Sequence, residues 1–174
     1  MKTMLLAIGN AGGNIVETIC KESENVALKD SEYIFADCDE DDLNTHKTEE
    51  CHTIKLDYED KEFPCSIFKR VEKLFIVAGL GGITGTKFVE LAIIAALNAN
   101  VSSINVFVTI PFSFEGEAII NRAKSAEKKI SSINGINTTT FHNDELSEKY
   151  ADLYAFNAFE KADIEIMQII EDTI

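Results

Sequence analysis

Basic residues are scarce in this chain, and their scarcity limits its partners. The 174 residues include 16 lysines and arginines against 30 aspartates and glutamates, for a net charge of -14. Phosphate backbones attract basic surfaces, so we expect no nucleic-acid partner. Most of the carboxylates are explained by solubility alone. A protein this acidic must hold a phosphorylated ligand locally, with backbone amides or a metal ion.

Long apolar runs and paired cysteines are also missing. No run reaches the roughly 18 residues needed to cross a bilayer, and the start MKTMLLAIGN lacks a signal-peptide cleavage pattern. We therefore expect a cytoplasmic protein without membrane insertion. The cysteines show no CxxC spacing, which argues against a zinc site and a disulfide framework. Cys51 beside His52 lacks a second ligand pair of suitable spacing.

Apolar runs alternate with helix-like stretches along the chain. Strands are expected at TMLLAIG, SEYIFADCD, KLFIVAGL and SINVFVTI, with shorter ones at HTIKL and in NTTTFHNDEL. Helices are expected from Asn14 to Lys21, over KFVELAIIAALNA and EAIINRAKSAEKKISSIN, and from Asn157 onward. Residues 40–63 are expected to be polar and irregular. This pattern predicts a single α/β domain with a three-layer, Rossmann-like, mostly parallel sheet covered by helices on both faces.

Two glycine-rich turns, IGNAGGN and GLGGITGT, each follow an apolar run and precede a helix. A turn of this kind leaves the first helical amides unpaired at the positive end of the helix dipole, where an anion binds readily. Glycines in such turns can also serve tight packing alone. Two turns in one short chain favour a nucleotide.

Neither turn matches a standard phosphate motif. A P-loop requires GK before serine or threonine, whereas Lys87 follows Thr86, and Asn10 and Ala11 interrupt a GxGxxG pattern after Gly9. Asp37 or Asp39 lies where a dinucleotide-binding domain has its ribose-binding acid, so an NAD-type site remains an alternative. The same two acids could organise Mg²⁺ through water or could be solvated strand ends.

The ordered series NAGGN, DCD, AGLGGITGT, TIPFSFEG, HNDEL and AFEKAD resembles the tubulin/FtsZ group of self-assembling GTPases, and the bacterial FtsZ branch most. The resemblance covers nearly all of residues 1–174, which correspond to the family's guanine-nucleotide-binding domain up to its central helix, without the second domain. It implies GTP or GDP as the ligand, with Mg²⁺ as an accompanying ion. It also implies self-association or binding to a filament-forming relative.

The resemblance assigns roles to particular residues. Phosphate contacts fall to the two glycine turns, ribose to Glu115, and the base to Asn143, Phe159 and Asp163. Phe159 and Asp163 lie four residues apart, so on a helix they share one face, where a ring can stack on guanine and a carboxylate can accept from its donor edge. Without the resemblance, a core aromatic and an early-helix acid would be the preferred interpretation. The complete phosphate set is Asn10, Ala11, Gly12, Gly13, Asn14, Gly81, Gly82, Ile83, Thr84, Gly85 and Thr86.

Four departures from the family pattern bear on catalysis. The glycine-rich loop that senses the terminal phosphate is replaced by the shorter polar region 40–63. Ile119 stands where the family has a basic residue, and Ile83 stands at the third glycine of a triple, where a β-branched residue resists positive φ. The chain also ends at Ile174, before the family's catalytic acidic loop.

We therefore expect guanine nucleotide binding with little or no GTP hydrolysis by the chain alone. The first alternative is a non-enzymatic interaction module whose nucleotide site is degenerate and which modulates filaments. The second is a dinucleotide-binding domain.

Overall fold

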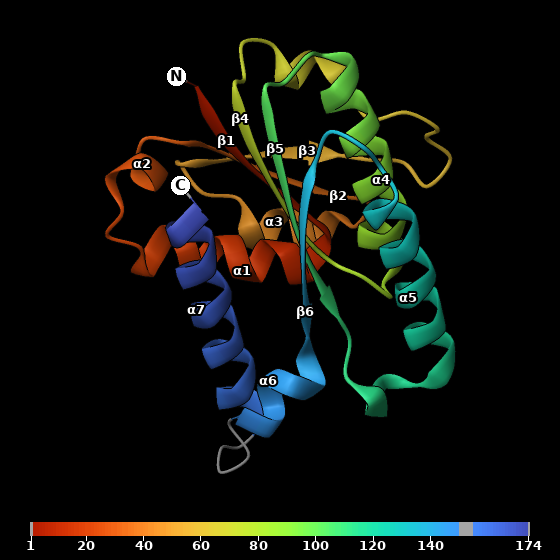
Figure 1. The fold of residues 1–174 in the computed structure, drawn as a ribbon. Coiled ribbons are helices and arrows are strands. Elements are labelled where there is room, and N and C mark those ends of the chain that lie inside the picture. Colours follow the sequence, from red (N-terminus) through yellow and green to blue (C-terminus); the bar gives the residue numbers. More distant parts are fainter. Residues whose placement is uncertain (1, 150–154, 174) are drawn as a thin grey trace.

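Six parallel strands form the central sheet of the computed structural model, which describes residues 2–149 and 155–173. The strand order is β3-β2-β1-β4-β5-β6. Helices cover both faces of the sheet, as the alternating sequence pattern predicted (Figure 1). The strands are β1 (Thr3–Ile8), β2 (Glu32–Asp37), β3 (Cys51–Lys55), β4 (Lys73–Gly79), β5 (Ser103–Ile110) and β6 (Asn137–His142).

The helices form two layers with different partners. The helices are α1 (Gly9–Glu22), α2 (Val26–Lys29), α3 (Glu40–His46), α4 (Ile83–Asn98), α5 (Glu117–Ser131), α6 (Asn143–Lys149) and α7 (Ala155–Thr173). In Figure 1, α4 and α5 lie on one side of the sheet, and α1 and α7 on the other. Short 3₁₀ turns, η1 (Cys65–Phe68) and η2 (Ser113–Glu115), precede β4 and α5.

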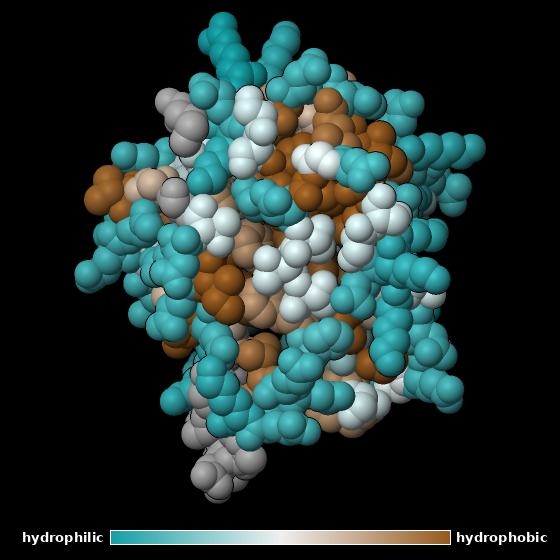
Figure 2. All heavy atoms as spheres, viewed as in Figure 1, coloured by the Kyte–Doolittle hydropathy of each residue, from teal (hydrophilic) through white to brown (hydrophobic). Residues whose placement is uncertain are grey.

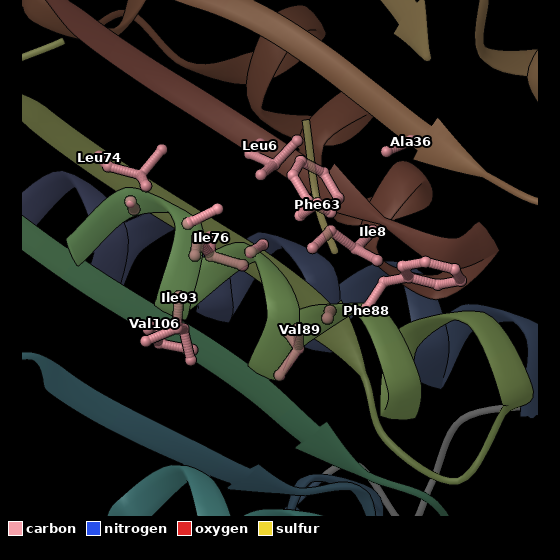
Figure 3. Packing of buried hydrophobic residues seen from close by; sticks show 14 of the residues in the cluster. Leu6, Ile8, Ala36, Phe63, Leu74, Ile76, Phe88, Val89, Ile93 and Val106 are labelled. Carbon is pink, nitrogen blue, oxygen red and sulfur yellow. The ribbon is translucent and has the colours of Figure 1, made fainter. Parts of the chain in front are cut away.

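Alternate residues of each central strand supply the two halves of the core. Leu6, Ile8 and Ile76 point into the layer beneath α4, where Phe88 and Val89 pack against them (Figure 3). Leu5, Ala7 and Phe75 face α1 and α7 on the other side, with Ile15, Val16, Ile166 and Ile170. Because both sides of each central strand are buried, these strands are continuous apolar runs in the sequence.

The edge strand β6 is less apolar than the central strands. Its residues 138–140 are threonines of intermediate exposure, and it pairs in parallel only with β5. Figure 2 shows a pale, weakly polar area over this strand, with hydrophobic patches above it and to its left. No helix among the described residues is both long and apolar enough to cross a membrane.

Two local predictions were wrong. The first helix begins at Gly9 rather than at Asn14, so the first glycine turn belongs to α1. Region 40–63 is not irregular throughout, because Asp39 caps the helix α3: its Oδ1 accepts from the amides of Asp41 and Asp42 at 2.8 and 3.1 Å. An N-terminal cap of this kind stabilises a short polar helix that has little apolar periodicity.

Candidate functional site

A cleft of about 450 Å³ opens at the carboxyl ends of the parallel strands. Helices α1 and α6 begin beside it directly after β1 and β6, and α4 begins beside it after the glycine turn that follows β4. Neither α1 nor α4 has an acidic residue in its first turn, so their free amides and dipoles are available to an anion. The lining residues are Gly9, Asn10, Ala11, Asp37, Asp39, Asp42, Tyr58, Gly79, Leu80, Gly82, Ile83, Thr84, Gly85, Thr109, Pro111, Glu115, Asn143 and Phe159.

Eleven predicted site residues line this cleft. They come from both glycine turns, the strand-end acids, the PFSFEG segment, the start of α6 and α7, although these segments lie far apart in the sequence. The sheet topology brings them together, because all the strands are parallel and end at one edge. The eleven are Asn10, Ala11, Asp37, Asp39, Gly82, Ile83, Thr84, Gly85, Glu115, Asn143 and Phe159.

Gly12 and Gly13 do not line the cleft. A Cβ at Gly12 would lie 2.3 Å from the carbonyl oxygen of Val77, and one at Gly13 would lie 2.8 Å from the His46 ring. These glycines let α1 approach β4 and α3 closely. Close packing therefore accounts for the missing side chains of this pair, and the phosphate contacts expected of their backbone amides stay a prediction. Asn14 is exposed on α1 and is also outside the cleft lining.

The two glycine turns also pack against each other. Gly9 has φ +76°, and a Cβ there would lie 3.2 Å from the amide nitrogen of Gly85. A Cβ at Gly85 would lie 2.2 Å from the carbonyl oxygen of Gly79. By contrast, a Cβ at Gly82 would meet nothing within 4 Å, so Gly82 faces open space at the N-cap of α4. Close backbone contact thus explains why position 85 has no side chain, whereas no such contact restricts Gly82, which lines the cleft.

The second turn is stabilised by residues outside the cleft lining. The Gly81 amide donates to Thr86 Oγ1 at 2.9 Å, and Arg122 Nη1 donates to the Gly81 carbonyl oxygen at 2.8 Å. Thr86 therefore shapes the turn from behind. The family has a basic residue at the position of Ile119, and Arg122 lies one helical turn after that position. A cationic side chain therefore does contact the second glycine turn, through the backbone carbonyl of Gly81. Arg122 was not among the residues predicted from the sequence.

Ile83 causes no backbone strain, which corrects the expectation drawn from its position. It is the first residue of α4, in helical conformation, and its side chain is 61% exposed. A helical residue requires no positive φ, so the β-branched side chain is tolerated there. Its effect is to place an apolar group on the rim of the cleft.

The acids of the cleft have structural partners. Asp37 is buried, and its Oδ1 accepts from Thr84 Oγ1 at 3.0 Å and from the Cys38 amide at 2.6 Å. The hydrogen bond from Thr84 joins the end of β2 to the start of α4. Glu115 Oε1 accepts from the Phe112 amide at 2.8 Å, which fixes the turn before α5.

Metal binding by side chains alone is not indicated. Within residues 2–149 and 155–173, no group of three or more histidine, cysteine, aspartate or glutamate side chains is arranged to hold a metal ion. Asp37, Asp39 and Asp42 nevertheless lie along one wall of the cleft. Such a wall fits Mg²⁺ held mainly by phosphate oxygens and water, since this ion takes few protein carboxylates.

Aromatic rings gather at the α7 end of the cleft. Phe159 is 45% exposed and meets Phe112 edge to face, with ring centroids 4.9 Å apart and an interplanar angle of 85°. Phe114 stacks on the same Phe112 ring at 5.0 Å. The exposed face of Phe159 is a surface on which a planar base could stack.

Asp163 is half-buried one turn after Phe159 and does not line the cleft. Burial, and to a smaller extent the negative charge of Glu160, raises the pKa of Asp163 to about 7. A carboxyl in this state needs a hydrogen-bond donor to stabilise its charged form. The ring N–H and amino group of guanine are donors of that kind.

Several cleft residues were not predicted. Thr109 is a polar residue next to the end of β5, a signal that the sequence does contain. Asp42 belongs to α3, which was expected to be irregular. Tyr58 comes from the segment after β3 and reaches the cleft only through the path of the chain, for which the sequence holds no local signal.

The fold that forms this cleft is also found in solved structures of other proteins. No protein-family model and no curated protein matches the chain. Among solved structures, it is similar to the empty FtsZ dimer of M. jannaschii, with a TM-score of 0.79, 17% identity, and coverage of 98% of this chain and 53% of that one.

Two further structures have the same arrangement. The GTPγS-bound protofilament of CetZ2 from Haloferax volcanii has a TM-score of 0.75 and 17% identity, and covers 98% of this chain and 57% of its own. The GDP-form protofilament of TubZ from Bacillus thuringiensis serovar israelensis has a TM-score of 0.75 and 14% identity, with coverage of 99% and 55%. The chain thus spans about half the length of the structures it matches. It has a tubulin/FtsZ-like fold.

Proposed function

We propose that this chain is an FtsZ-like guanine nucleotide-binding protein of the cell-division or cytoskeletal filament type. The observation that carries the proposal is the single cleft that brings together two helix N-termini, Glu115, Asn143 and the exposed face of Phe159. In this assignment the amides of α1 and α4 bind the phosphates, Glu115 accepts from the ribose hydroxyls, and Phe159 stacks on the base. Structures of the same fold are described as GTPγS-bound and GDP-bound.

Magnesium is part of the proposal because of the charges in the cleft. Asp37, Asp39, Asp42 and Glu115 line it, and no lysine or arginine is among its lining residues. Phosphates entering such a site require a cation to offset repulsion. We expect GDP and GTP to bind with Mg²⁺ and to bind much more weakly in EDTA.

Slow or absent GTP hydrolysis completes the proposal. The segment between β3 and η1, residues 56–64, contains no glycine, unlike the glycine-rich loop that the family has there for the terminal phosphate, and its Tyr58 lines the cleft. The diphosphate should therefore bind at least as well as the triphosphate. Titration calorimetry with GDP, GTP, ADP and NAD, together with a phosphate-release assay, tests these statements. Absence of guanine binding at millimolar ligand would contradict them, and NAD binding would favour a dinucleotide site.

Phe159→Ala should weaken GDP binding by about tenfold to a hundredfold, because stacking on an aromatic ring contributes about 1–3 kcal/mol per base. Calorimetry of both proteins measures the change. Phe114→Ala is the matched control: its ring also stacks on Phe112 but lies outside the cleft lining. Equal effects of the two substitutions would argue against a base-binding role for Phe159.

A second candidate function is a protein-interaction module, and the rim of the cleft supports it. Three large apolar side chains with exposures of 45% or more line the cleft, namely Tyr58, Ile83 and Phe159, and Phe114 lies beside them with 74% exposure. Exposed apolar clusters of this kind are typical of interaction sites. Structures of the same fold are described as protofilaments.

Ile83→Ser with Phe114→Ser should abolish self-association, or co-sedimentation with a filament-forming relative, without lowering the melting temperature. Exposed side chains contribute little to folding but are desolvated in an interface. Sedimentation velocity and pelleting assays measure the effect. Val26→Ser is the matched control, since Val26 is 70% exposed on α2, which precedes β2 at the other end of the sheet. Unchanged association in the double variant would eliminate this rim as the interface.

A further inference from the structure

A second cavity lies on the α1 side of the sheet, apart from the cleft. It has a volume of about 330 Å³ and lies between α1, the end of α3 and the strands β1, β2 and β3. The cavity and the cleft have no lining residue in common. A ligand bound here would therefore be additional to a nucleotide and would not depend on it.

The inner wall of the cavity is mainly apolar. Val16 and Phe35 line it and are 3% and 1% exposed, and the His46 ring packs edge to face on Phe35. Cys20 of α1 and Cys51 of β3 contribute two sulfur atoms. Burial raises the pKa of both thiols, that of Cys20 to about 12, so the sulfur atoms carry no charge at neutral pH. A wall of sulfur and aromatic carbon favours an aromatic ligand, because sulfur–ring and ring–ring contacts add to the burial of apolar area.

The mouth of the cavity is acidic. Glu17, Glu49 and Glu50 line it, against a single lysine, Lys21. Lys21 forms an ion pair with Glu17, so these two charges offset each other. Glu49 and Glu50 are exposed, and neither has an ion-pair partner among the residues that the structure describes. Two uncompensated negative charges therefore remain at the mouth.

A hydrogen bond holds the segment that carries these two acids. The Cys51 amide donates to Thr48 Oγ1 at 3.0 Å, which closes a turn over residues 48–51. The negative charge of Glu50 also contributes to the raised pKa of Cys20 on the α1 side. This carboxylate therefore acts on the interior of the cavity.

We propose that this cavity binds a small aromatic amine, with its ring against Phe35 and the two cysteine sulfur atoms and its ammonium group at Glu49 and Glu50. The apolar wall selects the ring, and the two unpaired acids select a cation over a neutral or anionic group. The volume corresponds to about eleven water molecules and is at the lower end of the range for ligand sites, so the ligand is small.

Three indole compounds that differ in charge test the proposal by titration calorimetry. Tryptamine, the cation, should bind with a dissociation constant between about 10 µM and 1 mM, given the binding free energy usual for so few atoms. Tryptophol, which is neutral, should bind about fivefold more weakly, the effect of one favourable exposed ion pair. Indolepropionate, an anion, should bind more weakly again. Backbone amide NMR shifts locate the site, with the largest changes expected in residues 16–21 and 46–51.

A charge variant tests the two acids. Glu49→Gln with Glu50→Gln should weaken tryptamine binding about fivefold and leave tryptophol binding unchanged, because only the cation loses its partners. Glu22→Gln with Glu24→Gln is the matched control. It changes the net charge equally, at exposed acids that lie outside the cavity lining.

A filling variant tests the cavity itself. Cys20→Leu adds apolar volume on the α1 side and should weaken both tryptamine and tryptophol about tenfold or more, because the ring no longer fits. If Cys20→Leu does not fold, the charge variant and its control carry the test.

Four results would overturn the proposal. Absence of tryptamine binding at millimolar concentration would show that the cavity takes no such ligand. Equal binding of the three indoles, or equal effects of the charge variant and its control, would exclude recognition by the two acids. NMR changes centred on the cleft would assign the amine to the acids there.

Discussion

Gly12→Ala is expected to lower the free energy of unfolding by about 3 kcal/mol, at the upper end of the usual cost of overpacking. Alanine normally stabilises a helix position relative to glycine by about 1 kcal/mol. Here its Cβ would lie 2.3 Å from the carbonyl oxygen of Val77, and a backbone atom of a central strand cannot move aside cheaply. The contact between α1 and β4 must therefore open, which reverses the usual sign.

Denaturant and thermal unfolding measure this effect, with a fall in melting temperature of about 6–12 °C for a domain of this size. Gly85→Ala should behave in the same way, since its Cβ would lie 2.2 Å from the Gly79 carbonyl oxygen. Gly82→Ala is the matched control, because nothing lies within 4 Å of its added Cβ. If all three substitutions had similar effects, packing would not be the reason for these glycines.

Asp163→Asn is expected to stabilise the protein without nucleotide at pH 8 and to leave its stability nearly unchanged at pH 4. The pKa of Asp163 rises from 3.8 to about 7 on folding, because burial disfavours the charged carboxylate. A raised pKa means that the folded state holds its proton more tightly. This contribution is therefore fully present below the unfolded pKa and is lost between about pH 4 and pH 7. Its upper limit is about 4 kcal/mol, and partial exposure of the side chain reduces it.

Thermal unfolding of both proteins between pH 4 and pH 8 measures the difference. Asparagine cannot ionise, so the variant should lack this part of the pH dependence. GDP should diminish the variant's advantage at pH 8, because a bound guanine would supply donors to the ionised Asp163. Glu160→Gln is the control for the smaller charge effect. A pH profile shared by the natural protein and Asp163→Asn would show that this carboxyl is not the group responsible.

The architecture was largely predictable, because burial on both faces leaves a direct mark on composition. The apolar runs KLFIVAG and SINVFVTI coincide with β4 and β5, and the parallel order follows from the helices between strands. The parallel, doubly covered sheet predicted from these runs is confirmed. The helix α3 escaped prediction because a side-chain cap, rather than an apolar face, stabilises it.

The candidate site was predictable to a smaller extent. Residues at or shortly after the end of a strand, such as Asp37, Gly82 and Ile83, could be located at the cleft because parallel strands end at one edge. Gly12 and Gly13 carry the same residue type and a similar local pattern, yet they face β4 and α3. Sequence alone cannot separate a glycine that faces a ligand from one that faces a backbone, since both need only the absence of a Cβ.

The sequence by itself determined the layered α/β fold, the edge of the sheet where a ligand would lie and the acidic character of that edge. Only the tertiary structure decided which glycines line the cleft, that Thr84 binds Asp37, and that His46 reaches Asn10 at 2.9 Å. The physical reason is the range of the forces involved. Strand and helix patterns record burial over neighbouring residues, whereas hydrogen bonds between distant segments form only after the sheet has brought those segments within about 3 Å of each other.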